Sequence, residues 1–329
     1  MQEHPKMTLT RRRDCVRPGG PRRELPLRAS GVFKMALRWP ALSRGSMEGE
    51  STIVIGDVRS PVLSRGPANA REAVVFVHGN FGSREDWADL MRRLSPEVRS
   101  VAPDMPGFGA ASRPRDFDYT VEGYSRHLAA CLDRLGIDHA HLVLHDFGGL
   151  WGLAFATTHP DRVRSFTLIN AGIVDDDYRW HRWARVWQTP VLGELAFMSA
   201  NRFIVKTGLN ADNPKPLPDE FIDRIYSHMD GGQARAVLKL YRSARDIKAV
   251  LAPLLARLPL IADRPTLVVF GSADAYLPAR VAESQRTRFP RAEVHLLDGC
   301  GHWPFVDDPD RVAALVIPFL ASRSDARIG

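Results

Sequence analysis

The chain has 329 residues, of which 44% are hydrophobic and 25% charged, a balance typical of a soluble globular protein with one large domain or two smaller ones. The net charge of +7 comes from residues 1–46, where eleven Lys and Arg and three Asp and Glu give +8, so the remainder carries −1. A near-neutral remainder argues against an enzyme that acts on nucleic acid, and the lack of an apolar run of about 18 residues argues against a membrane span.

Residues 1–46 form a basic segment rich in Arg, Pro and Gly, with few apolar side chains. Such a segment cannot bury enough surface to order itself, so we expect a disordered N-terminal extension. Two other interpretations stay open: translation that begins at Met47, and a targeting peptide. The targeting peptide fits less well, because a secretory signal needs a continuous apolar core, and Asp14 and Glu24 are unusual in a transit peptide.

From Ser51 onward, strand and helix patterns alternate. A short hairpin is predicted over 52–58 and 61–64. Apolar runs typical of strands buried on both faces follow at 73–77, 100–102, 141–144, 165–169, 266–270 and 292–297. Helical patterns lie between them at 84–94, 121–135, 149–158 and 308–321. This alternation predicts an α/β fold with a mostly parallel sheet and helices on both faces.

One segment, residues 173–257, interrupts the alternation. It contains no convincing strand, and its helical patterns are rich in aromatic residues, namely Trp180, Trp183, Trp187, Phe197, Phe203, Tyr226 and Tyr241. We expect a helical cap inserted over the carboxyl edge of the sheet, where open α/β sheets place their sites. The predicted core then consists of residues 47–172 and 258–329.

Four polar motifs each follow a predicted strand. They are His-Gly-Asn-Phe-Gly-Ser at 78–83, Leu-His-Asp-Phe-Gly-Gly at 144–149, Gly-Ser-Ala-Asp at 271–274 and Gly-Cys-Gly-His-Trp-Pro at 299–304. Because the carboxyl ends of parallel strands meet at one edge, these motifs should converge. A nucleophile, an acid and a histidine in this chain order match the order of α/β-hydrolase triads.

These motifs, with Asp-Met-Pro-Gly-Phe-Gly at 104–109, make residues 51–325 resemble the α/β-hydrolase superfamily. The sequence His-Asp-Phe-Gly-Gly at 145–149 resembles the nucleophile turn of the epoxide hydrolase and haloalkane dehalogenase branch. The resemblance implies an α/β-hydrolase fold with an inserted cap. It also implies Asp146 as nucleophile, Asp274 as the acid and His302 as the base.

An aspartate at this turn suits a particular chemistry. A carboxylate with an ordinary pKa of roughly 3.9 is ionised near neutral pH, and its attack on an sp³ carbon gives a stable alkyl ester. His302 would then deprotonate the water that hydrolyses this ester, while Asp274 would fix the imidazole tautomer. The backbone N–H groups of Asn80 and Phe147 are the expected oxyanion donors.

The leaving group decides between the two branches. Dehalogenases of this type bind the halide through a tryptophan after the nucleophile and, in some members, an Asn after the His-Gly of the oxyanion loop. This chain has the Asn, Asn80, but Phe147 offers no side-chain N–H. A cap tryptophan (Trp180, Trp183 or Trp187) is the possible substitute.

Epoxide hydrolases of this type instead protonate the epoxide oxygen with cap tyrosines. The pair Tyr241-Arg242 lies 33 residues before Asp274, which resembles the position of the second of these tyrosines. The first has no clean match, since Tyr178 lies early and Tyr226 is off the pattern. Epoxide hydrolysis is therefore our preferred interpretation, ahead of dehalogenation, another C–O or C–C hydrolysis, and a ligand-binding protein without activity.

Simpler roles exist for these residues. The alternative for Asp146 is to cap the helix that follows it. The alternative for His302 is an ordinary surface position, and the alternative for Tyr241 is a role in packing alone. Asp263 and Asp298 are rivals of Asp274. We expect His78 and His145 to orient loops.

No metal or cofactor is implied, because no ligand cluster has suitable spacing and the chain supplies nucleophile, base and oxyanion donors. The three cysteines, Cys15, Cys131 and Cys300, give no disulfide framework and favour a reducing, cytoplasmic location. The expected partners are a small apolar organic substrate and water, without nucleic acid or membrane, for a monomer or homodimer.

Overall fold

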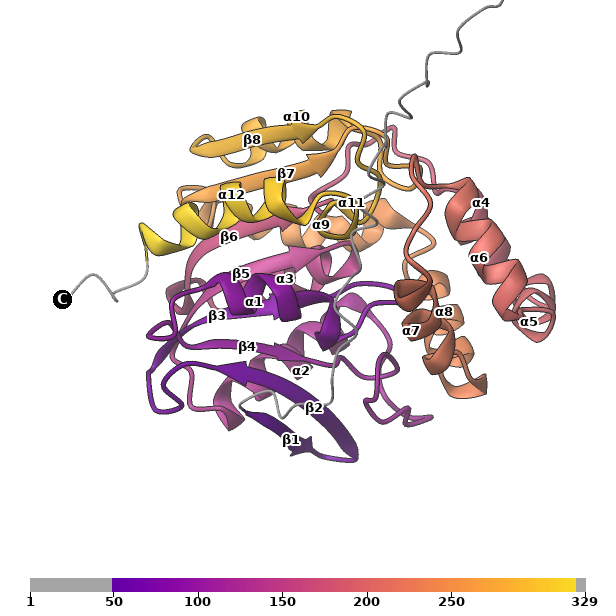
Figure 1. Ribbon diagram of the computed structural model, residues 1–329, viewed down its shortest axis with the longest axis horizontal. Coiled ribbons are helices and arrows are strands. Elements are labelled where there is room, and N and C mark those ends of the chain that lie inside the picture. The colour runs from indigo at the N-terminus through magenta and orange to yellow at the C-terminus, as the bar shows by residue number, and fades with distance from the viewer. Residues whose placement is uncertain (1–48, 324–329) are drawn as a thin grey trace, which may run out of the picture. The chain divides into compact units, whose positions relative to one another are not determined.

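The structure is a computed structural model and describes residues 49–323. The extension predicted over residues 1–46, with Cys15, lies outside the described residues. A single eight-stranded sheet forms the centre, in the order β1-β2-β4-β3-β5-β6-β7-β8 (Figure 1). Its strands are β1 Glu50–Ile55, β2 Val58–Arg65, β3 Glu72–Val77, β4 Ser100–Pro103, β5 His139–His145, β6 Val163–Ile169, β7 Thr266–Gly271 and β8 Ala292–Leu297. All predicted strands are present.

The sheet is parallel from β4 to β8, and β2 pairs antiparallel with both β1 and β4. The predicted hairpin is confirmed, but its turn comes earlier than expected. Gly56 adopts φ 55°, so the chain reverses at Gly56 and Asp57, and Val58 opens β2 instead of closing β1. Buried side chains alternate between the two faces of the sheet: Leu142 and Leu144 of β5 belong to one core cluster and Val143 to the other.

Helices cover both faces. One cluster includes side chains of α2 Val121–Arg134, α3 Phe147–Thr158, α9 Ile247–Arg257 and α10 Arg280–Arg288. The other includes side chains of α1 Ala88–Arg93, α11 Pro304–Asp307 and α12 Pro309–Ala321. Short 3-10 turns are η1 Arg84–Trp87, η2 Pro160–Arg162 and η3 Leu258–Leu260. The helix predicted over 84–94 therefore begins as η1 and continues as α1, and the other three predicted helices are present within about two residues.

The segment between β6 and β7 is helical throughout its regular structure, as predicted. It contains α4 Arg182–Gln188, α5 Leu192–Met198, α6 Arg202–Ala211, α7 Asp219–His228 and α8 Gly231–Ser243, which we call the cap helices. They lie beyond the carboxyl ends of the parallel strands, whereas α9 packs on α3 of the sheet layer (Figure 1).

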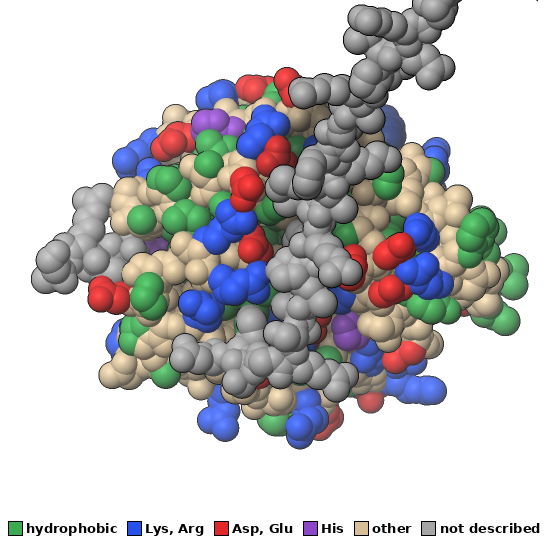
Figure 2. Space-filling model, in the orientation of Figure 1, with side chains coloured by type: hydrophobic (Ala, Val, Ile, Leu, Met, Phe, Trp, Pro, Cys, Tyr) green, Lys and Arg blue, Asp and Glu red, His purple; other side chains and the backbone are tan. Residues whose placement is uncertain are grey.

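The described surface is mixed in charge. Figure 2 shows Lys and Arg side chains interspersed with Asp and Glu on the visible face, as expected from the near-neutral sequence. Exposed large hydrophobic side chains gather on the cap helices, at Val191, Leu192, Leu195, Met198, Phe203 and Ile204. Over residues 49–323, no helix has the length and apolar character needed to cross a bilayer.

Candidate active site

Asp146 lies at the tip of a sharp turn between β5 and α3. Its backbone has φ 50° and ψ −125°, a strained conformation for a residue other than glycine. The turn is tight because Gly148 passes close to β3: a Cβ on Gly148 would lie 2.4 Å from the carbonyl oxygen of Val77. The Asp146 side chain makes no capping hydrogen bond to α3, which argues against the simple capping role.

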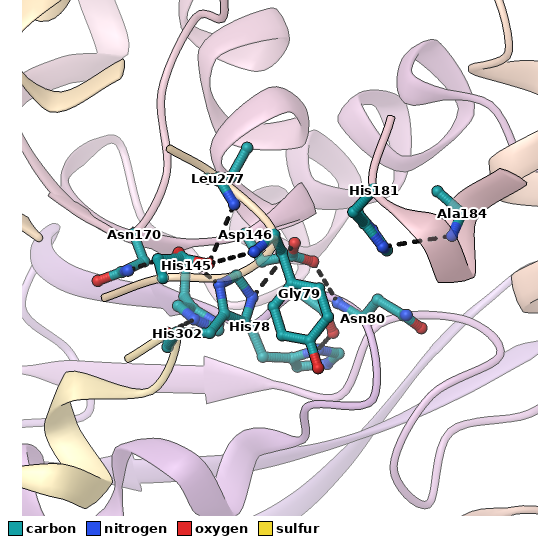
Figure 3. A network of polar contacts seen from close by, with 12 residues as sticks. His78, Gly79, Asn80, His145, Asp146, Asn170, His181, Ala184, Leu277 and His302 are labelled. Carbon is teal, nitrogen blue, oxygen red and sulfur yellow. Dashed lines mark hydrogen bonds and ion pairs between the residues drawn. The ribbon is translucent and has the colours of Figure 1, made fainter. Parts of the chain in front are cut away.

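The three predicted catalytic side chains converge at the carboxyl edge of the sheet, and Figure 3 shows two of them, Asp146 and His302. The Nδ1–H of His302 donates to Asp274 Oδ2 at 2.8 Å, and its Nε2 lies 3.5 Å from Asp146 Oδ2. His302 is buried, so it is not an ordinary surface residue. The rival acids lie elsewhere: Asp263 is exposed beside Arg264, and Asp298 is exposed after β8.

Asp274 is held by a hydrogen-bond network that was not predicted from the sequence. Its Oδ1 accepts from the backbone N–H groups of Tyr276 at 2.7 Å and Leu277 at 3.0 Å, and its Oδ2 accepts from Asn170 Nδ2 at 2.6 Å. Asn170 follows β6 directly and also accepts from the backbone N–H of Gly271. A polar residue at the end of a predicted strand was the available signal for Asn170.

Electrostatics favour a protonated His302 between two carboxylates. Burial favours the neutral imidazole, but the negative charges of Asp274 and Asp146 outweigh it and raise the pKa of His302 to about 10. Burial likewise opposes the charge of Asp146, yet its interactions with His302 and the Asn80 N–H lower the pKa of Asp146 to about 2. The resting site therefore holds an ionised Asp146 across the physiological pH range.

One of the two predicted oxyanion donors contacts the other oxygen of Asp146. The backbone N–H of Asn80 donates to Asp146 Oδ1 at 2.7 Å. Phe147 is the first residue of α3, so its backbone N–H has no partner within the helix. Both groups can thus serve an oxygen at the carboxyl carbon of Asp146.

Loop-orienting roles fit His78 and His145. The backbone N–H of Met105 donates to His78 Nε2 at 3.0 Å, and His78 Nδ1 donates to the Gly79 oxygen at 2.9 Å. His145 Nε2 donates to the His302 carbonyl at 2.9 Å, and burial lowers the pKa of His145 to about 4. Neutral His145 therefore braces the loop that carries His302.

A cavity of about 110 Å³ opens over Asp146. Its polar lining comes from the core residues Asn80, Asp146, Tyr276 and His302 and from His181 and Tyr241 of the cap segment. The remaining lining is mostly apolar and includes Trp187, Phe197 and Leu209. Polar groups thus gather at the carboxylate while the rest of the cavity suits an apolar molecule.

Tyr241 is buried at this cavity, where Asn80 Nδ2 donates to its hydroxyl at 3.3 Å. Burial, reinforced by the charge of Asp146, holds the pKa of Tyr241 well above its usual value of 10. The phenol therefore keeps its proton and can donate it to an oxygen in the cavity. Neither rival tyrosine lines this cavity: the Tyr178 hydroxyl is 3.4 Å from the Tyr276 carbonyl, and Tyr226 lines a separate depression.

Two of the three cap tryptophans use their indole N–H groups elsewhere. Trp180 Nε1 donates to the Ala244 carbonyl at 3.2 Å, and Trp183 Nε1 donates to Asp212 Oδ2 at 2.9 Å. Trp187 lines the cavity and packs on Tyr241 with a centroid separation of 4.9 Å. Of the three cap tryptophans, Trp187 is therefore the remaining candidate to replace the halide-binding tryptophan that this chain lacks after Asp146.

Replacing Gly79 with Ala is expected to lower turnover by about 100-fold, because a Cβ at Gly79 would lie 2.4 Å from Asp146 Oδ1 and displace the carboxylate. Steady-state kinetics together with thermal unfolding will check this. Gly231→Ala is the matched control, since nothing lies within 4 Å of a Cβ there. Equal activities of the two variants would show that close packing of Gly79 against Asp146 does not position the carboxylate.

Residues 49–323 contain no group of three or more His, Cys, Asp or Glu side chains placed to hold a metal ion. Cys131 and Cys300 are buried free thiols.

Comparison with known proteins identifies the fold family. A family model described as alpha/beta hydrolase fold matches residues 72–309. A 2-hydroxy-6-oxo-2,4-heptadienoate hydrolase of Pseudomonas putida is 28% identical, over 82% of this chain and 95% of that protein. Haloalkane dehalogenase 2 of Mycobacterium bovis is 28% identical, over 74% and 86%.

A solved structure, the haloalkane dehalogenase DbeA from Bradyrhizobium elkani, superposes with a TM-score of 0.73 at 23% identity, covering 84% of this chain and 99% of that one. This likeness supports the fold alone. Together with the family match it confirms the predicted architecture: the chain belongs to the α/β hydrolase fold family and is an α/β-fold hydrolase.

Proposed function

We propose that this hydrolase opens epoxides to diols through a covalent alkyl ester on Asp146. The observation that carries the proposal is the position of the Tyr241 hydroxyl, which lines the same cavity as Asp146 and stays protonated. A strained ring needs a nucleophile at carbon and an acid at oxygen. The apolar remainder of the cavity favours a small apolar substrate.

In the first step, an Asp146 oxygen attacks a ring carbon, the C–O bond of the epoxide breaks, and the ring oxygen takes the Tyr241 proton. The products are an ester on Asp146 and a tyrosinate that Asn80 Nδ2 stabilises. Formation of the ester removes the negative charge of Asp146, so the pKa of His302 falls. His302 then releases its proton, which restores the Tyr241 phenol.

In the second step, neutral His302 accepts a proton from water as the water oxygen attacks the ester carbonyl carbon. The N–H groups of Asn80 and Phe147 stabilise the oxyanion. Ester, water and neutral His302 become carboxylate, alcohol and protonated His302, which is the resting state. The cycle therefore balances without a metal or cofactor in any step.

Haloalkane dehalogenation is the second candidate. The side chain of Asn80 beside the nucleophile favours it, as does the similarity to haloalkane dehalogenase 2. Against it, Phe147 has no side-chain donor, and the Trp180 and Trp183 N–H groups have other partners. A panel of small epoxides and bromoalkanes, assayed for diol and for bromide, separates the two: bromide release without diol formation would overturn our proposal.

Tyr241→Phe is expected to slow diol formation by about 100-fold or more, because the variant has no acid for the departing oxygen. Any bromide release should change far less, since a halide needs no proton. The matched control is Tyr226→Phe, which removes a hydroxyl from α7 outside the cavity. Diol formation at the parent rate in Tyr241→Phe would rule out Tyr241 as the acid.

A further inference from the structure

The cap segment brings a second polar side chain, His181, into the cavity over Asp146. It immediately precedes α4, and its ring lies with its centroid 6.0 Å from that of Tyr241 and 4.9 Å from that of Tyr276. Both tyrosines line the same cavity. His181 therefore stands where a substrate bound over Asp146 meets the cap.

The hydrogen bond at the start of α4 defines the tautomer of His181. The backbone N–H of Ala184 donates to His181 Nδ1 at 3.3 Å (Figure 3), so Nδ1 has no proton and acts as the acceptor. In a neutral imidazole the proton then resides on Nε2. The ring thus keeps one N–H donor on the side away from the helix.

The surroundings keep this imidazole neutral. Burial lowers the pKa of His181 to about 4, and the charges of His302 and Arg182 act in the same direction. The carboxylates Asp146 and Asp274 act oppositely but do not outweigh burial. At neutral pH His181 is therefore an uncharged hydrogen-bond donor. It does not form an ion pair with Asp146, which would block the attack of that carboxylate.

We propose that His181 is a catalytic residue whose Nε2–H donates a hydrogen bond to the epoxide oxygen as the ring opens. This inference rests on the proposed function. Tyr241 transfers its proton to that oxygen, whereas His181 keeps its own proton and stabilises the developing negative charge. Two cap donors, one phenol and one imidazole, then act on a single oxygen opposite Asp146.

Two substitutions separate this role from the capping of α4. His181→Asn keeps a side-chain oxygen that can accept from Ala184 N–H, since Asn is a favoured N-cap, but it removes the ring donor. His181→Ala removes both. If the Nε2–H donor of His181 is needed, both variants are slow. If only the hydrogen bond that caps α4 is needed, His181→Asn keeps the parent rate.

The readout separates the two half-reactions by rapid quenching and intact-mass spectrometry, with a small terminal epoxide as probe. We expect His181→Asn to slow formation of the Asp146 adduct by about 100-fold, as for loss of one oxyanion donor. Hydrolysis of the adduct should be unchanged, because it uses His302, Asp274 and the Asn80 N–H. A merely structural role would slow both steps.

Adduct formation at the parent rate in His181→Asn would overturn the inference, as would recovery by Asn of a defect seen with Ala. A failure of the proposed function gives a different result: the His302→Gln variant, with no other substitution, would form no epoxide adduct at all. That result would remove both proposals, whereas normal adduct formation in His302→Gln combined with His181→Asn removes only the role of His181.

Discussion

Replacing His302 with Gln is expected to abolish turnover by about 10⁴-fold or more while leaving alkylation of Asp146 intact, so that the ester accumulates. Gln fills a similar volume but cannot accept a proton from water. In the proposed mechanism His302 is needed only in the second half-reaction, because Asp146 attacks as a carboxylate that is already ionised. Intact-mass spectrometry after incubation with an epoxide should show one added substrate mass, assigned to Asp146 by peptide mapping.

The pH of this experiment matters. The hydrogen bond and charge of His302 help to lower the pKa of Asp146, whereas burial of Asp146 raises it. Without His302 the pKa of Asp146 will therefore rise, and adduct formation is best measured near pH 8. Asp146→Asn in the His302→Gln background is the control and should show no added mass. If His302→Gln alone forms no adduct with epoxides or with bromoalkanes, the aspartyl-ester mechanism is refuted.

The strand-end motifs explain why much of this fold was predictable. Continuous apolar runs predicted β3 to β8, and the polar motifs that follow β5, β7 and β8 predicted that Asp146, Asp274 and His302 would converge. Parallel strands with short connections leave little freedom at that edge. The hairpin turn was misplaced because Gly56 was not recognised as the residue with positive φ.

Contacts across the cap were harder to predict, because they depend on tertiary packing. His181 and Asp146 line the same cavity although they come from separate elements, and the sequence around His181 is that of an ordinary aromatic helix start. The partners of Trp180 and Trp183 lie 64 and 29 residues away, so no local pattern shows that their N–H groups are engaged. The leaving group was therefore the part of the function that the sequence left open.

Asp274→Asn should slow ester hydrolysis by about 10⁴-fold, the size of the loss when the equivalent acid of a serine protease triad becomes an amide. In the parent, Oδ1 accepts from the backbone N–H groups of Tyr276 and Leu277, while Oδ2 accepts from His302 and Asn170. The Asn oxygen will take the Oδ1 position, so its NH₂ group will face His302 Nδ1.

An amide donor at Nδ1 forces the proton of His302 onto Nε2, the nitrogen that faces Asp146, and Nε2 can then no longer accept a proton from water. The ester should accumulate as in His302→Gln, although the imidazole is still present. Asp298→Asn, at an exposed site after β8, is the matched control and should turn over normally. Rapid hydrolysis of the ester by Asp274→Asn would mean that another residue orients His302.

Unfolding gives an independent check on the same variant. The folded pKa of His302 is raised to about 10 against about 6.5 in the unfolded chain, so its protonation stabilises the fold fully below about pH 6.5. This contribution is lost as the pH rises through about 10. Without the charge of Asp274 the pKa of His302 falls, and the decline in Tm between pH 7 and 10 should be shallower in Asp274→Asn than in Asp298→Asn. Equal slopes would show that Asp274 does not hold a protonated His302 in the resting enzyme.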